Sequence, residues 1–106
     1  MPDGEVPATA KIGETVPVKF TLKDIAPGLK LAADLHGRTA GGKYMGMVKW
    51  GEAPKAAESG KTVVFNILVV SKPDLGSVHV ASHLSSTGEF KDRVKEAKSA
   101  EIKIVQ

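Results

Sequence analysis

The stretch TVPVKFTLK, residues 15–23, alternates apolar side chains with proline, lysine or threonine over its whole length. Successive side chains of an extended chain point to opposite faces, so the apolar members of this stretch share one face. They are Val16, Val18, Phe20 and Leu22. An amphipathic helix would instead repeat about every 3.6 residues. The stretch predicts a half-buried strand, and Pro17, which has no N–H to donate, predicts that the strand lies at a sheet edge or carries a bulge.

Similar extended patterns recur along the chain, separated by turn-forming residues such as Pro27-Gly28. They cover residues 6–12, 29–36, 43–50, 61–71, 77–84 and 102–105. About seven short strands with frequent turns are typical of a β-sandwich or barrel. A length of 106 residues suits a single domain, 1–106. We therefore expect an all-β fold with two antiparallel sheets.

The segment from Glu89 to Ala100 is the ambiguous part of the chain. Phe90, Val94 and Ala97 would share one face of a helix, which predicts one short helix near residues 89–99. An extended loop or hairpin arm is the alternative that the same residues leave open.

Composition excludes several classes of function. The chain has no cysteine, so disulfides and thiolate chemistry are absent. Its 15 basic residues are nearly all lysine and are dispersed, which favours a solvated surface over a nucleic-acid site. No apolar run approaches the roughly 20 residues of a membrane helix, and Met1–Glu5 lacks the pattern of a signal peptide. The compartment stays open, and an extracellular or cell-surface location is favoured if the chain is an excised domain.

Two segments carry a resemblance to a known class of domains. Through KIGETVPV, residues 11–18, and GSVHV, residues 76–80, the chain resembles the immunoglobulin-like modules of bacterial multidomain proteins. The resemblance spans most of the chain at the level of fold. It implies a non-catalytic module that spaces other domains or binds a protein. Antibody-type domains differ in having a cysteine pair, and their core tryptophan comes earlier than Trp50 does here.

The histidines offer one candidate metal site. His79 and His83 would share a face of a helix, as in zinc proteases. On a strand they lie about 13 Å apart, too far for two ligands that each lie about 2 Å from one zinc ion. We therefore expect two solvent-facing histidines and no metal cofactor.

A soluble copper carrier is a further alternative. Met45 and Met47 share a face of a regular strand, and His36 lies across the predicted hairpin. Thioether and imidazole are ligands that suit copper. Methionine is also a common filler of irregular gaps in a core, and this is the simpler interpretation.

Tyr44 and Trp50 are the chain's single tyrosine and single tryptophan. On an unbroken strand they share a face and lie about 20 Å apart. Exposed aromatic rings stack on the C–H faces of sugars, which predicts a carbohydrate-binding module as the main alternative function. A core or strand-end role for Trp50 competes with this interpretation.

The strand at residues 61–71 is apolar on both faces. We expect Val63, Phe65, Ile67 and Val69 to face the core. The opposite face then exposes an apolar stripe of Val64, Leu68 and Val70, which either residues 89–100 or another protein would cover. No serine elbow, phosphate loop or clustered carboxylate pair is visible. The leading expectation is a non-catalytic immunoglobulin-like module that binds another protein or a neighbouring domain.

Overall fold

The computed structural model describes residues 4–105, and apart from one short 3-10 turn its regular structure is all strand. Residues 1–3 and residue 106 lie outside the described part. Residues 1–3 form most of Met1–Glu5, the segment that lacks the pattern of a signal peptide. The all-β prediction is confirmed. The strands are β1 Thr9–Lys11, β2 Thr15–Thr21, β3 Leu29–Thr39, β4 Tyr44–Trp50, β5 Lys55–Ala57, β6 Thr62–Leu68, β7 Leu75–Ser85, β8 Arg93–Lys98 and β9 Ile102–Val105.

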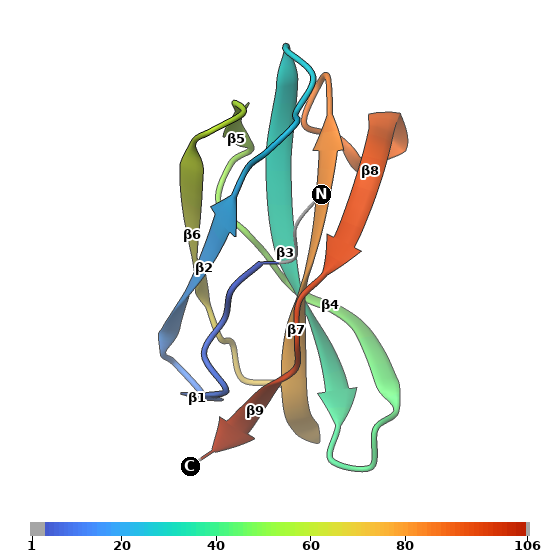
Figure 1. Ribbon diagram of the computed structural model, residues 1–106. Helices are drawn as coiled ribbons and strands as arrows, with labels where there is room; N and C mark the ends of the chain where they lie inside the picture. The colour runs from blue at the N-terminus through green and yellow to red at the C-terminus, as the bar shows by residue number, and fades with distance from the viewer. Residues whose placement is uncertain (1–3, 106) are drawn as a thin grey trace.

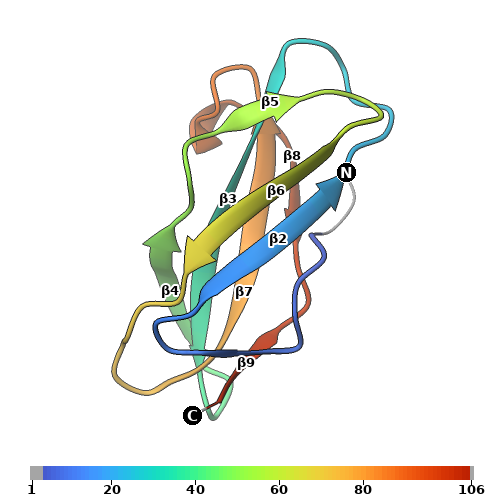
Figure 2. The same ribbon diagram turned by 90° about the vertical axis from the view of Figure 1, so that its left-hand side faces the viewer.

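The strands form two sheets, as the sequence predicts (Figure 1). The larger sheet has the order β1-β9-β7-β3-β4, with β5 also paired to β3 and β8 also paired to β7. The smaller sheet is the antiparallel pair β2–β6, which lies across one face of β3 and β7 (Figure 2). Because β1 runs parallel to β9, the larger sheet is mixed, and the expectation of purely antiparallel sheets is wrong at this edge.

The core lies between the two sheets. Val18, Phe20 and Phe65 are completely buried there, and the rings of Phe20 and Phe65 meet edge to face at 6.0 Å. The alternation at residues 15–23 therefore predicted the buried face correctly. Pro17 also lies where its missing N–H predicts, because a strand of a two-stranded sheet has a free edge.

β3 and β7 form the centre of the larger sheet and pair over ten positions, from Lys30 to Thr39 of β3. Their inward side chains, such as Leu35 and Val80, are buried in the core, as alternation predicts. The side chains between them point to the opposite face of the sheet, away from β2 and β6.

β4 departs from regular alternation. Lys49 pairs with Leu35 and Met47 with the next residue, His36, so that Val48 is an extra residue in β4. A second shift makes Met45 an extra residue, next to Gly46 with a φ of 85°. These two β-bulges each turn the chain so that the following side chain changes face.

The segment from Glu89 to Ala100 takes the extended alternative, and the prediction of a helix near residues 89–99 is wrong. A 3-10 turn, η1 Phe90–Asp92, leads into β8, which pairs with β7 from Ala81 to Ser85. Val94 is 62% exposed in β8, so the helical spacing of Phe90, Val94 and Ala97 does not mark a buried face. The segment between the predicted strands at 43–50 and 61–71 contains a further short strand, β5.

The register of β6 makes a testable prediction. Phe65→Ala should lower the free energy of unfolding by about 3–5 kcal/mol, because it leaves a cavity beside Phe20. Val64→Ala, on the exposed face of the same strand, should cost less than about 1 kcal/mol. Urea unfolding measures both, and equal losses would contradict the assigned faces.

Candidate functional site

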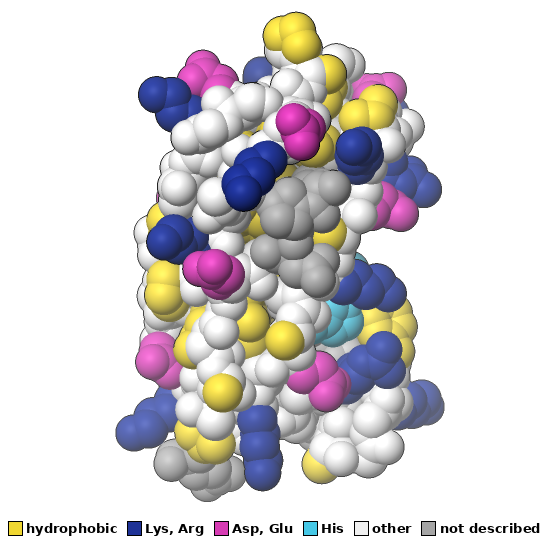
Figure 3. Space-filling view, in the orientation of Figure 1, with side chains coloured by type: hydrophobic (Ala, Val, Ile, Leu, Met, Phe, Trp, Pro, Cys, Tyr) yellow, Lys and Arg dark blue, Asp and Glu magenta, His cyan; other side chains and the backbone are white. Residues whose placement is uncertain are grey.

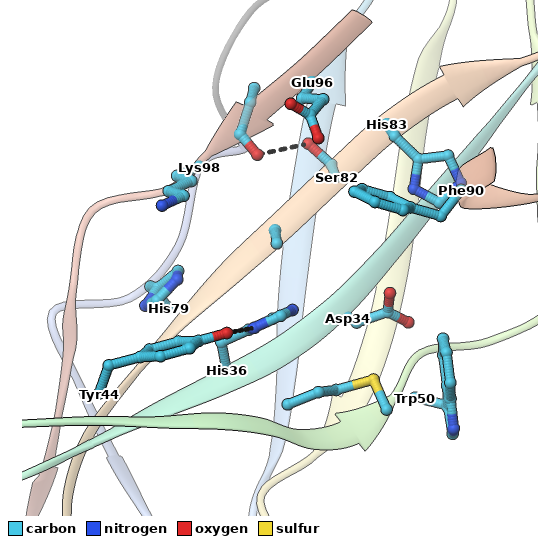
Figure 4. A pocket seen from close by; sticks show the side chains of 13 residues that line it. Asp34, His36, Tyr44, Trp50, His79, Ser82, His83, Phe90, Glu96 and Lys98 are labelled. Carbon is cyan, nitrogen blue, oxygen red and sulfur yellow. Dashed lines mark hydrogen bonds between the residues drawn. The ribbon is translucent and has the colours of Figure 1, made fainter. Parts of the chain in front are cut away.

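The outer face of the larger sheet contains a hollow of about 620 Å³. Its walls come from β3 and β4 and from β7, η1 and β8, two groups that are far apart in the sequence. In Figure 4, His36, Tyr44 and His79 lie at one end, and His83 and Phe90 lie at the other. We call this site the aromatic hollow. It is lined by Asp34, His36, Tyr44, Met47, Trp50, His79, Ala81, Ser82, His83, Phe90, Glu96, Ala97 and Lys98.

The aromatic hollow gathers every aromatic side chain that is not in the core. The chain has five Phe, Tyr or Trp residues, and Phe20 and Phe65 are the two in the core. The other three, Tyr44, Trp50 and Phe90, are 52%, 68% and 55% exposed and all line the hollow. All three histidines of the chain line it as well. Such a concentration of large rings on an outer sheet face is typical of a binding site.

A small residue makes room for the hollow. Ala81 lies between His79 and His83 on the outward face of β7. Its cross-strand neighbours are Asp34 on β3 and Lys98 on β8. Because Ala81 ends at its methyl group, the longer side chains around it stand above it as walls.

The bulges of β4 bring Tyr44, Met47 and Trp50 to this face together. They lie opposite Arg38, His36 and Asp34, which share the outward face of β3. In β3, Asp34 and Arg38 are four residues apart, so Tyr44 and Trp50 are about 13 Å apart along the strand. The prediction that these two rings share a face is correct, and the predicted separation of about 20 Å is wrong because the bulges shorten β4.

At one end of the hollow, three rings form a cluster. Tyr44 Oη lies 2.7 Å from Nδ1 of His36, and the ring centroids of His36 and His79 are 5.5 Å apart with nearly parallel planes. Burial lowers the pKa of His36 below its usual 6.5, and Lys98 lowers it further against the opposing effect of Asp34.

The pKa of His79 is lowered by the same physical effects. Burial is the largest cause, followed by the nearby His36, Lys98 and Arg38, while Glu101 acts in the opposite direction. Both imidazoles of the cluster therefore favour the neutral form at pH 7.

At the other end, His83 supports the wall. Its Nε2–H donates to the carbonyl of Gly88 at 3.0 Å, and its ring is nearly perpendicular to that of Phe90, with centroids 5.5 Å apart. His79 and His83 are each only 5% exposed, so the expectation of solvent-facing histidines is wrong. They do point to the outer face of β7, where the hollow's other residues cover them.

Trp50 is held at the rim by a close backbone approach. The N–H of Gly51 donates to Oδ1 of Asp34 at 3.1 Å. A Cβ at position 51 would lie 1.9 Å from the carbonyl oxygen of Ala33. Only glycine allows this approach, and it fixes where β4 ends beside Trp50.

The copper ligands proposed from the sequence are not brought together. Met47 lines the hollow opposite His36, but Met45 lies on the inner side of the sheet, where its Cβ approaches Gly37 near Leu75. The rings of His36 and His79 are stacked, so the in-plane lone pairs of their nitrogens run alongside each other and do not converge on one metal ion. Within residues 4–105, no group of three His, Asp or Glu side chains is placed to hold a metal ion.

The apolar stripe lies on the opposite side of the molecule, on the smaller sheet. Val64 and Leu68 are 40% and 42% exposed, whereas Val70, beyond the end of β6, is half-buried. Residues 89–100 do not cover the stripe, because β8 belongs to the larger sheet. That part of the sequence interpretation is wrong.

Comparison with known protein families finds no match, and no curated protein has a similar sequence. The described residues include no helix that is long and apolar enough to cross a membrane. The functional argument for this chain therefore depends on the geometry of its surfaces.

The neutral histidines predict a pH dependence of stability. Unfolding returns His36 and His79 to a pKa near 6.5, so below pH 6.5 the unfolded chain binds more protons than the folded chain. The free energy of unfolding should therefore fall as the pH drops from about 7 to about 5. The double variant His36→Gln/His79→Gln should show a flatter profile in urea titrations, and a profile as steep as that of the parent chain would contradict the assignment.

Proposed function

We propose that this chain is a non-catalytic, immunoglobulin-like β-sandwich module that binds a carbohydrate chain in the aromatic hollow. The single observation that carries the proposal is that Tyr44, Trp50 and Phe90, the three aromatic residues outside the core, surround one hollow. Large aromatic side chains that are exposed side by side usually mark a surface that binds a ligand.

The chemistry of the hollow suits a sugar. The flat faces of Tyr44 and Trp50 offer apolar surface to C–H groups, while Asp34, Glu96 and Lys98 offer hydrogen bonds to hydroxyls. The separation of about 13 Å between the two rings favours a chain of several sugar units over a single one.

The strand pairing supports the immunoglobulin-like part of the proposal. In that fold the second and fifth strands pair in one sheet, and the third and sixth pair in the other. Here β2 pairs with β6 and β3 pairs with β7, which fits this scheme if the short β5 is counted as an insertion. On this count β4 is the fourth strand, but it pairs with β3, whereas the fourth strand of a constant-type domain belongs to the other sheet.

The two carboxylates of the hollow support a non-catalytic role. Asp34 and Glu96 are two strands and two residues apart on the same face, which is about 12 Å. Glycoside hydrolysis uses carboxyl pairs that are about 5–9.5 Å apart, with one acid kept protonated. Glu96 is exposed and forms an ion pair of 2.7 Å with Arg93.

A second candidate function is binding of a protein to the apolar stripe. The exposure of Val64 and Leu68 on the outward face of β6, on either side of Asn66, favours it. A second copy of this chain is the simplest partner, because a two-fold dimer brings the same face of both copies together.

Carbohydrate binding can be tested by calorimetry with a panel of soluble oligosaccharides. Trp50→Ala should weaken binding at least about tenfold, since an anchoring ring contributes more than about 1.4 kcal/mol. Ala81→Leu should weaken binding similarly by filling the floor of the hollow, and its position outside the core should leave folding intact. Leu68→Ala, on the opposite side of the molecule, is the matched control and should bind like the parent chain.

Two outcomes would contradict the proposal. One is the absence of binding to every glycan in the panel, with Trp50 emission unchanged. The other is the release of shorter sugars from a bound oligosaccharide, because this would mean that the hollow is catalytic.

Self-association through the stripe can be tested by analytical ultracentrifugation. If a second copy docks there, the parent chain should dimerise as its concentration rises, and Val64→Ser/Leu68→Ser should remain monomeric. A parent chain that stays monomeric at all concentrations would rule out a dimer through this face.

A further inference from the structure

A second, more open hollow of about 410 Å³ adjoins the aromatic hollow. The two share His79 and Lys98 as lining residues, so a ligand that extends past Tyr44 enters the second hollow directly. We call it the basic hollow. It is lined by Arg38, Gly42, His79, Lys98, Ser99 and Glu101.

The basic hollow has an excess of positive charge. It contains Arg38 and Lys98 against the single acid Glu101. Among residues 4–105 the four ion pairs do not include Lys98, which leaves its ammonium group available. Figure 3 shows the same feature on the surface, with Lys and Arg side chains on either side of a recessed histidine at the right of the molecule.

The one acid does not fully occupy the neighbouring cation. Glu101 lies 3.8 Å from Nε of Arg38 and also accepts a hydrogen bond of 3.0 Å from Ser77. Arg38 donates one N–H to the carbonyl of Gly42 at 3.0 Å and lies 5.7 Å from the ring centroid of Tyr44. A guanidinium has further N–H donors in a planar fork that suits carboxylate and sulfate oxygens.

The positive charges already act on the shared wall. Lys98 and Arg38 both lower the pKa of His79, after burial and His36. The positive charges of Arg38 on β3 and Lys98 on β8 are therefore felt at His79, where the two hollows meet.

We infer that the carbohydrate bound by this chain is acidic, with a sugar ring in the aromatic hollow beside Tyr44 and its carboxylate or sulfate group between Arg38 and Lys98. This inference rests on the proposed carbohydrate binding and adds the chemical class of the sugar. Neutral glycans would occupy the aromatic hollow alone and would leave Lys98 without an ion-pair partner among residues 4–105 and the further N–H donors of Arg38 unused.

The test uses calorimetry to compare the affinities of three oligosaccharides of equal length. They are an oligogalacturonate, its uncharged methyl ester, and an oligosaccharide of neutral sugars that carries sulfate groups. At low salt an acidic oligosaccharide should bind at least about tenfold more tightly than the neutral ester, and this preference should shrink at about 0.5 M salt because the exposed charges are screened. The galacturonate and sulfated arms distinguish a carboxylate from a sulfate as the preferred anion.

Variants locate the effect. Arg38→Gln should reduce affinity for the preferred acidic oligosaccharide about fivefold to tenfold and leave affinity for the methyl ester unchanged, because Arg38 lines only the basic hollow. Lys98→Gln should reduce affinity for the acidic oligosaccharide by a similar factor and affinity for the methyl ester by much less, because Lys98 also lines the aromatic hollow. Lys95→Gln is the matched control, because Lys95 lies on the same strand, β8, but lines neither hollow. All three side chains lie outside the buried core, and thermal unfolding checks that the variants fold.

The outcomes separate the two proposals. Equal affinity for acidic and neutral oligosaccharides, or losses in Lys98→Gln that match those in Lys95→Gln, would overturn the acidic class while carbohydrate binding stands. Failure of all three oligosaccharides to bind would overturn the proposed function and this inference together.

Discussion

The antiparallel pairing of β3 with β7 is the constraint on which the rest of the structure depends. Every other strand of the larger sheet except β1 pairs with one of these two strands. Their register puts Leu35 opposite Val80 on the core face and His36 opposite His79 on the outer face. A slip of one residue would exchange the two faces, burying imidazoles among leucines and exposing the core. The same pairing therefore determines both the stability of the sandwich and the composition of the aromatic hollow.

The hollow depends on local irregularities as much as on this register. Two bulges in β4 turn three large side chains to one face, and Ala81 leaves space between two imidazoles. The close approach of Gly51 to β3 then ends β4 beside Trp50. Bulges often occur next to binding sites because they redirect a side chain without disturbing the sheet around it. Here they concentrate aromatic surface at one place while the core keeps strict alternation.

The sequence predicts the regular part of this molecule well and the irregular part poorly, for a physical reason. Core faces follow a period of two, because burial selects apolar side chains at every second position. The bulges break that period, so alternation wrongly predicts a shared face for Met45 and Met47 and overestimates the separation of Tyr44 and Trp50. The spacing of three between Tyr44, Met47 and Trp50, together with Gly46, was a signal that alternation alone does not use. Phe90 could not be assigned, because its place beside His83 depends on long-range pairing of β8 with β7.

The arrangement of rings on the outer face can be measured directly without any ligand. Nuclear Overhauser spectroscopy of the free chain reports proton pairs closer than about 5 Å, which suits ring centroids that are 5.5–6.5 Å apart. The account predicts contacts from Tyr44 to His36 and His79, and a separate contact from Phe90 to His83. Contacts between Tyr44 and His83, or none between Tyr44 and the other two histidines, would contradict the register of β3, β4 and β7 and with it the aromatic hollow.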